Sequence, residues 1–224
     1  RLDRDGYRFD TGPTVLTMPG LVADALDCVG EELDDWLDLL PLTPAYRARF
    51  ADGSSLDVHT DPDAMAGAIT ELCGPAEADG YRRMVRWLHR LYRYEMRDFI
   101  DRNVDSPLGL LTPNLARLVA AGGFGRLAPR VGRYLRDDRT RRVFTFQAMY
   151  AGRSPYDALA LYAVISYMDT VAGVYFPRGG MHALPAALAG AATKHGVDIR
   201  YGTEVARVER AGGRAVAVHT AAGE

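Results

Sequence analysis

Lysine, cysteine and long apolar runs are scarce in this sequence. Lys194 is the only lysine, so arginine carries almost all of the positive charge. Cys28 and Cys73 lie far apart in helix-like segments and lack the spacing of a metal site or a CxxC motif. We therefore expect two buried free thiols and a reducing, cytoplasmic compartment. The most apolar run, Ala158–Met168, is too short for a membrane span, which requires about 20 residues.

The sequence also lacks a basic excess and the common motifs of hydrolysis and metal binding. The formal net charge is −2, whereas nucleic-acid-binding proteins usually carry a strong basic excess, so we expect no nucleic-acid partner. Neither an HExxH motif nor a GxSxG nucleophile elbow occurs. The histidines are scattered, with no carboxylate at ligand spacing: His59, His89, His182, His195 and His219. Hydrolysis and metal chemistry are therefore disfavoured.

The order of strand-like and helix-like segments predicts an α+β fold. We divide the chain into residues 1–60 with short strands, a helical block at 61–172, and a return to strands at 173–224. The pattern predicts helices at 19–28, from 61, and at 77–102, 114–121, 139–150, 156–170 and 181–195. It predicts strands at 6–10, 46–50, 55–59, 174–176, 198–201, 204–210 and 214–220, with Asp52-Gly53 turning a hairpin. The helical block would then be an insertion in a larger fold.

Residues 77–102 have the clearest periodicity and predict one long amphipathic helix. Its apolar face would comprise Tyr81, Met84, Val85, Leu88, Leu91, Tyr92 and Phe99, and its other face Arg82, Arg86, Arg90, Arg93 and Arg97. We favour a solvated charged face over a surface that binds anionic lipid headgroups.

One glycine-rich segment, Gly123–Ala128, matches the relaxed GxGxxA pattern of dinucleotide-binding sites. Such a site needs a strand before the glycines and a helix after them. Here a helix-like run precedes the glycines and Pro129 follows, so we do not interpret this match as a dinucleotide site.

Two other glycine-rich segments suit a flat ligand better. Each places a strand end against a turn, at Gly12-Pro13-Thr14 and at Gly179-Gly180-Met181. Because glycine has no side chain, backbone at both turns can approach a flat ligand closely. We also expect the first N–H groups of the helix after Gly180 to be free to donate to an electron-rich partner. Each segment on its own also fits a purely structural turn.

Taken together and in this order, four segments resemble the carotenoid (phytoene) desaturase family, within the FAD-containing amine-oxidoreductase superfamily. The segments are Gly6–Thr14, the helical block, Tyr175–Leu184 and Gly202–Val208. The resemblance implies FAD as cofactor, with Gly12, Pro13 and Thr14 beside the flavin ring. It also implies Gly179, Gly180 and Met181 between flavin and substrate, and Val205 near the adenine.

The resemblance further implies a two-domain FAD-dependent oxidoreductase fold with an incomplete Rossmann-like FAD domain. Residues 1–60 and 173–224 would belong to the FAD and substrate domains, and 61–172 would face the substrate and the membrane. The chain opens at Arg1 and ends at Glu224 beside a hairpin, so we expect an interior section. It lacks the family's N-terminal GxGxxG unit and C-terminal flavin-covering segment, and we do not expect it to be active alone.

The implied chemistry is desaturation of a long apolar polyene of the phytoene type. A hydride would pass to the flavin with proton loss from the neighbouring carbon, and the electrons would leave through a quinone or oxygen. Arg153 and Asp157 are candidate catalytic groups, although Ser154 before Pro155 fits a simple helix start equally well. The alternatives are a carotenoid ketolase or isomerase, an amine or protoporphyrinogen oxidase, or a non-catalytic carotenoid-binding or membrane-associated piece.

A peripheral membrane surface is expected at residues 106–136. This stretch contains no acidic residue and mixes apolar side chains with Arg117, Arg126, Arg130, Arg133 and Arg136. Basic and apolar groups together are typical of a segment that lies on an anionic membrane. Internal packing of the same segment is the other interpretation, and charge reversal at Arg126 and Arg130 would separate the two.

Overall fold

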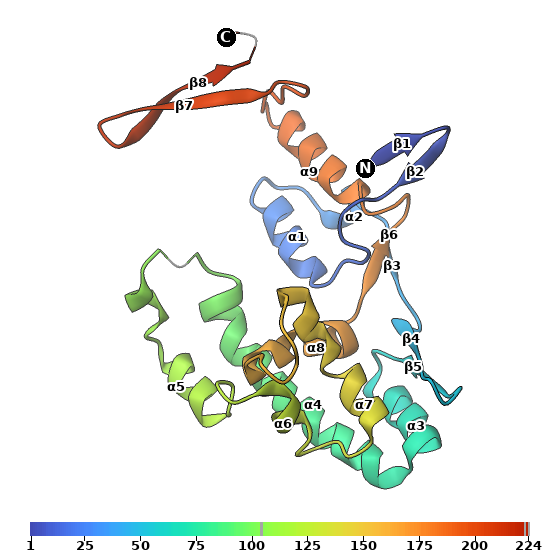
Figure 1. Ribbon diagram of the computed structural model, residues 1–224. Helices are drawn as coiled ribbons and strands as arrows, with labels where there is room; N and C mark the ends of the chain where they lie inside the picture. The colour runs from blue at the N-terminus through green and yellow to red at the C-terminus, as the bar shows by residue number, and fades with distance from the viewer. Residues whose placement is uncertain (104, 222, 224) are drawn as a thin grey trace.

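The computed structural model, which describes residues 1–103, 105–221 and 223, has two ends of different character (Figure 1). One end is a helical block that begins with α3. The other end contains α1 (Pro19–Asp27), α2 (Leu33–Trp36) and α9 (Ala183–Lys194), with short hairpins near both termini. The structure is therefore mixed helix and strand, as the sequence predicted at this coarse level.

The helical block starts at Asp61, where the sequence predicted that a helix begins. The Oδ1 atom of Asp61 accepts hydrogen bonds from the N–H groups of Asp63 and Ala64 at 3.1 and 2.7 Å, and Pro62 occupies the first helical turn. The helices are α3 (Pro62–Cys73), α4 (Pro75–Glu95), α5 (Pro113–Ala120), α6 (Leu127–Val131), α7 (Asp138–Val143) and α8 (Ala163–Tyr167). Short 3-10 turns at 107–110, 146–151 and 160–162 and π turns at 96–100 and 168–172 join them.

The core of the block is built around α4. Its fully buried side chains are Tyr81, Met84, Trp87, Leu88 and Leu91, and the five arginines of the other face are exposed, as predicted. Neighbouring segments close over this face: the ring of Phe144 lies 5.4 Å from that of Tyr81, and Trp87 Nε1 donates to the Ala121 carbonyl at 3.0 Å. The α-helix ends at Glu95, earlier than the predicted end at 102, because a π turn continues the chain from there.

The strands form four antiparallel pairs among the described residues. They are β1 (Leu2–Arg4) with β2 (Tyr7–Phe9), β3 (Leu39–Pro41) with β6 (Tyr175–Pro177), β4 (Tyr46–Arg49) with β5 (Ser55–Val58), and β7 (Val205–Ala211) with β8 (Arg214–Thr220). Three of these pairs are local hairpins, and the predicted turn at Asp52-Gly53 is confirmed. The pair β3–β6 is long-range and places Leu40 opposite Phe176, so it connects the two halves of the chain.

Two predicted helices are broken because other groups take their hydrogen bonds. In 139–150, α7 ends at Val143, whose carbonyl accepts from the side chains of Gln147 and Tyr46. In 156–170, the N–H groups of Ala160 and Leu161 donate to the glycine turn at 123–125, so the α-helix begins only at Ala163.

The predicted strand at 198–201 does not form. No neighbouring strand pairs with this segment in the part of the chain that the structure describes, and a strand needs a partner for its backbone groups.

The prediction of two buried thiols is also wrong. Cys28 is exposed because it directly follows α1 in the turn that leads to α2, whereas Cys73 at the end of α3 is half-buried. Burial raises the pKa of the Cys73 thiol to about 11. Both cysteines are free.

Candidate cofactor site

The two glycine turns singled out in the sequence lie side by side in the structure. Asp10, which directly follows β2, reaches the start of α9: its Oδ2 accepts from the Met181 N–H at 2.7 Å and its Oδ1 from the His182 N–H at 3.2 Å. Further along, Leu16 and Tyr175 exchange both backbone hydrogen bonds at 2.8 Å. The turn at 12–14 is therefore anchored on both sides to the segment that carries Gly179 and Gly180.

The expectation that the first N–H groups of the helix after Gly180 are free is wrong, because the Ala183 and Leu184 N–H groups donate to the Gly180 and Met181 carbonyls and the two preceding N–H groups donate to a side chain. The Met181 and His182 N–H groups donate to the Asp10 carboxylate. An acidic side chain at a helix N-terminus both satisfies unpaired N–H groups and interacts favourably with the helix dipole. An external anion would therefore have to displace Asp10.

The backbone at these turns leaves room for a flat ligand. A Cβ atom built at Gly12 or Gly179 would meet nothing within 4 Å, and Gly12, Pro13, Thr14 and Gly179 are all exposed. Gly179 also has a φ of +92°, a conformation that L side chains rarely adopt. A planar group could therefore approach the backbone of both turns from the open side.

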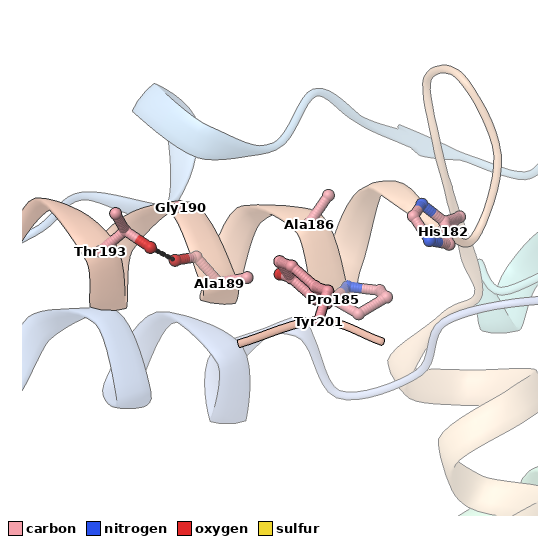
Figure 2. Close-up of a pocket in the computed structure, with 7 residues that line it drawn as sticks. All are labelled: His182, Pro185, Ala186, Ala189, Gly190, Thr193 and Tyr201. Carbon is pink, nitrogen blue, oxygen red and sulfur yellow. Dashed lines mark hydrogen bonds between the residues drawn. The ribbon is translucent and has the colours of Figure 1, made fainter. Parts of the chain in front are cut away.

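A cavity of about 490 Å³ runs along one face of α9 (Figure 2). It is lined by His182, Pro185, Ala186, Ala189, Gly190, Thr193 and Tyr201, so small side chains form its floor. At Gly190 the helix also packs closely against α2, because a Cβ atom built there would stand 2.5 Å from the Trp36 ring. The cavity is open, and no ligating cluster of His, Cys, Asp or Glu occurs in the described part of the chain.

The remaining predicted site residues lie elsewhere. Val205 begins β7 in an exposed hairpin that projects from the molecule (Figure 1). Arg153 and Asp157 are exposed in the loop between the 3-10 turns of the helical block, where the Asp157 carbonyl accepts from the Arg126 guanidinium. Among the described residues, no hydrogen bond or ion pair joins any of the three to the glycine turns. The structure thus brings the two turns together and leaves the other candidates apart.

The GxGxxA match at 123–128 does not form a dinucleotide site. Helix α5 precedes the glycines. The carbonyls of Gly125 and Gly123 accept hydrogen bonds from the N–H groups of Ala160 and Leu161, so the glycines form a turn that packs inside the helical block.

Sequence reasoning missed two buried carboxyl groups whose pKa values are raised. Burial raises the pKa of Asp169 to about 6, with Tyr150 hydrogen-bonded to it, and raises the pKa of Glu95 to about 8. Each stands at one of the two π turns, and π turns frequently occur at functional sites. Asp169 could have been noticed because it is a charged residue directly after the apolar run at 158–168. Glu95 lies at the end of a helix rich in charged residues, so the sequence gives no such signal there.

The whole chain, residues 1–224, matches the model of the flavin-containing amine oxidoreductases. The chain is 63% identical to a phytoene dehydrogenase of Streptomyces griseus, over 98% of this chain and 43% of that relative. It is 38% identical to a phytoene desaturase of Neurospora crassa, over 93% of this chain and 36% of that protein. It is 33% identical to a zeta-carotene-forming phytoene desaturase of Myxococcus xanthus, over 100% of this chain and 43% of that protein.

The chain belongs to the flavin-containing amine oxidoreductase family. Its relatives within that family include the carotenoid desaturases that the sequence resembles. The chain spans about two fifths of the length of these relatives.

Family membership gives FAD as the cofactor, in agreement with the expectation from sequence. The residues present fit a flavin ring, because Gly12 and Gly179 offer open backbone to a flat group and Asp10 holds their segments together. The assignment of individual residues to FAD contacts stays a prediction.

Proposed function

We propose that this protein carries out FAD-dependent desaturation of a long apolar polyene of the phytoene type. The single observation that carries the proposal is the 63% identity to a phytoene dehydrogenase over nearly the whole chain. The pair of open glycine turns supports it, since they suit a flat cofactor. The finer fold is part of the proposal: residues 1–60 and 173–224 contribute to FAD and substrate domains, and 61–172 to the substrate-facing insertion.

The chain would mainly position the cofactor and the substrate and exclude water, and it would supply little acid–base chemistry. Bound FAD supplies the hydride acceptor for such a reaction, which is the difficult step. Gly12 and Gly179 would let the ring lie against backbone, and Met181, which is buried, would hold the start of α9 behind it. Apolar residues of the helical block would orient the polyene and exclude water. Arg153 and Asp157 stay candidates for polar contacts near the substrate.

The test is an assay in liposomes with FAD, phytoene and a quinone. The protein as encoded by its complete gene should generate a red-shifted, multi-banded absorbance spectrum, and an oxygen-only reaction tests oxygen as the alternative acceptor. The relative named hydroxyneurosporene desaturase of Cereibacter sphaeroides, 37% identical over 96% of this chain, makes a hydroxylated carotenoid the second substrate to try. Bound flavin without any new chromophore would instead favour a ketolase, an isomerase or an amine or protoporphyrinogen oxidase.

Gly12 permits a sharp variant for this test. Its φ is not in the left-handed region and a Cβ atom there has free space, so Gly12→Val should fold and yet block the approach of a flat ring. We expect loss of FAD binding with little change in Tm. Gly67→Val is the matched control, because Gly67 is also exposed and unobstructed but lies in α3. Equal FAD affinity in both variants would reject Gly12 as a cofactor contact.

We further propose peripheral attachment to the cytoplasmic face of a membrane through residues 106–136. Leu108 and Leu111 are 76% and 71% exposed, and Val119 and Phe124 are exposed beside them in the sequence. Several exposed apolar side chains in one segment that also carries arginines are typical of a surface that lies on an anionic membrane. No helix in the described residues is long and apolar enough to cross a membrane.

The contacts of the arginines in this segment decide which substitutions to test. Arg130 donates to the Ala121 carbonyl and lies 5.3 Å above the Trp87 ring, and Arg126 is bonded to Asp157, so both have structural roles. Arg117 and the two leucines are better targets. The double variant Leu108→Asp and Leu111→Asp should weaken binding to anionic liposomes in a sedimentation assay.

The control for the membrane test is a comparably apolar exposed residue elsewhere, Val216→Asp in β8. It should sediment with the liposomes as the unmodified protein does. Unchanged sedimentation of the leucine double variant at low salt would reject this surface, and Arg117→Glu should add to the loss if headgroup charge contributes.

A further inference from the structure

Asp10 joins the two glycine turns although it belongs to neither. Its carboxylate accepts from the N–H groups of both Met181 and His182. It also lies against Gly180, where a Cβ atom would stand 2.6 Å from Oδ2. Both this contact and a φ of +101° favour glycine at 180, whereas a Cβ atom at Gly179 or Gly12 would face open space.

The contact at Asp10 closes a frame around the two turns. On one side, Leu16 and Tyr175 exchange two backbone hydrogen bonds at 2.8 Å. On the other side, the Asp10 carboxylate holds the start of α9. Residues 11–15 and residues 176–180 lie between these two anchors and run alongside each other. The first anchor is backbone and does not depend on side chains, while the second depends on one carboxylate.

We propose that Asp10 is a positioning residue that holds the two glycine turns at the spacing required to receive a flavin ring. This inference rests on the proposed FAD-dependent function. Without the carboxylate, the two segments are anchored only at Leu16 and Tyr175, so the turns can separate. FAD binding must then also bring the turns back together, which weakens the affinity for FAD.

Glu31 provides a matched control at the opposite end of the same helix. Its carboxylate is buried and accepts from Trp36 Nε1 at 2.9 Å and from Lys194 Nζ at 2.8 Å, and it contacts His195 Nε2 at 2.8 Å. Glu31→Gln therefore loosens the attachment of α9 without touching either glycine turn. A general effect of loosening α9 would appear in this variant as well.

The test compares Asp10→Asn with Glu31→Gln in the protein encoded by the complete gene. In Asp10→Asn one carboxylate oxygen becomes an NH₂ group that cannot accept from a backbone N–H. We expect the Kd for FAD, measured by flavin fluorescence, to rise tenfold or more, and the visible spectrum of the residual bound flavin to shift toward that of free FAD. Glu31→Gln should lower Tm but leave the Kd within about threefold of the unmodified protein, a difference of less than about 1 kcal/mol.

Asp10→Ser guards against a variant that fails to fold. Serine keeps one oxygen that can accept and places no NH₂ group against the backbone N–H groups, so it should restore part of the FAD affinity that Asp10→Asn loses. Amide hydrogen exchange of the peptide that contains Met181 and His182 gives a readout that needs no cofactor, and it should accelerate in Asp10→Asn alone.

Two results would overturn the proposal. One is an unchanged Kd and flavin spectrum in Asp10→Asn, and the other is an equal rise in Kd in Glu31→Gln. Failure of the proposed function looks different: the unmodified protein would itself bind no FAD, while amide exchange at Met181 would still respond to Asp10→Asn.

Discussion

Glu95 ends α4 with its carboxyl group buried, and its replacement should make the protein more stable at neutral pH. The residue is 5% exposed, and its Oε1 atom has no hydrogen-bond partner among the described residues. Burial without a partner disfavours the charged form, which raises the pKa of Glu95 from 4.5 to about 8. The folded protein therefore holds a proton that the unfolded chain releases.

The sign and size of the effect follow from this difference in proton binding. Stability is greatest below the unfolded pKa of 4.5 and falls as the pH rises toward the folded pKa of about 8. Between about pH 5.5 and about pH 7.5 the loss attributable to this group is about 2.5 kcal/mol. Glu95→Met has a similar volume and no ionisable group, so it should lack this loss.

The assay is urea denaturation of the unmodified protein and Glu95→Met at the two pH values. Other groups, including Asp169, titrate in both proteins and cancel in the comparison. The stability advantage of Glu95→Met should grow by about 2.5 kcal/mol from the lower to the higher pH. Glu71→Met in α3 is the control, because Glu71 is exposed. A constant difference between the unmodified protein and Glu95→Met would refute the reasoning.

Three further predictions concern the helical block and the two cysteines. The buried Glu77 carboxylate accepts hydrogen bonds from two backbone N–H groups at 3.0 Å and from a threonine hydroxyl. Glu77→Gln should therefore lower the free energy of unfolding by about 2 kcal/mol. Identical denaturation curves for this variant and the unmodified protein would contradict this. Gly80→Ala normally stabilises a helix by about 1 kcal/mol, but here its Cβ would meet the Tyr134 carbonyl oxygen at 2.1 Å. We expect a lower Tm, and a higher Tm would show that α4 can shift without cost. A thiol reagent at about pH 8 should label exposed Cys28 and spare Cys73 until the protein unfolds, as mass spectrometry of the labelled peptides would report.

Sequence reasoning succeeded where structure is set by neighbouring residues. Pro19 and Asp61-Pro62 start helices and Asp52-Gly53 turns a hairpin, because capping and turn formation involve residues within about four positions. The amphipathic period of α4 identified its buried face for the same reason. The glycine turns were singled out because glycine leaves backbone uncovered, and their role as cofactor contacts stays a prediction.

Sequence reasoning failed where distant groups compete for backbone hydrogen bonds. The apolar run at 156–170 has the composition of one helix, yet the turn at 123–125 accepts the N–H groups of Ala160 and Leu161. Asp10 resembles an ordinary turn residue, and nothing local indicates that it caps a helix 171 positions away. Glu95 gives no local sign of burial either, because only the packed block removes it from water.

The pairing of β3 with β6 helps to explain how two short turns so distant in sequence come to lie side by side. Leu39–Pro41 enters the helical block and Tyr175–Pro177 leaves it, and their antiparallel register fixes where the chain returns. Leu16 adds its bridge to Tyr175 on the same strand, so the return also aligns 11–15 with 176–180. The helical block between the two strands can therefore pack around α4 while the pairing of β3 with β6 keeps the glycine turns side by side. The position of α9 then depends on two carboxylates from the first 31 residues, Asp10 at its start and Glu31 at its end.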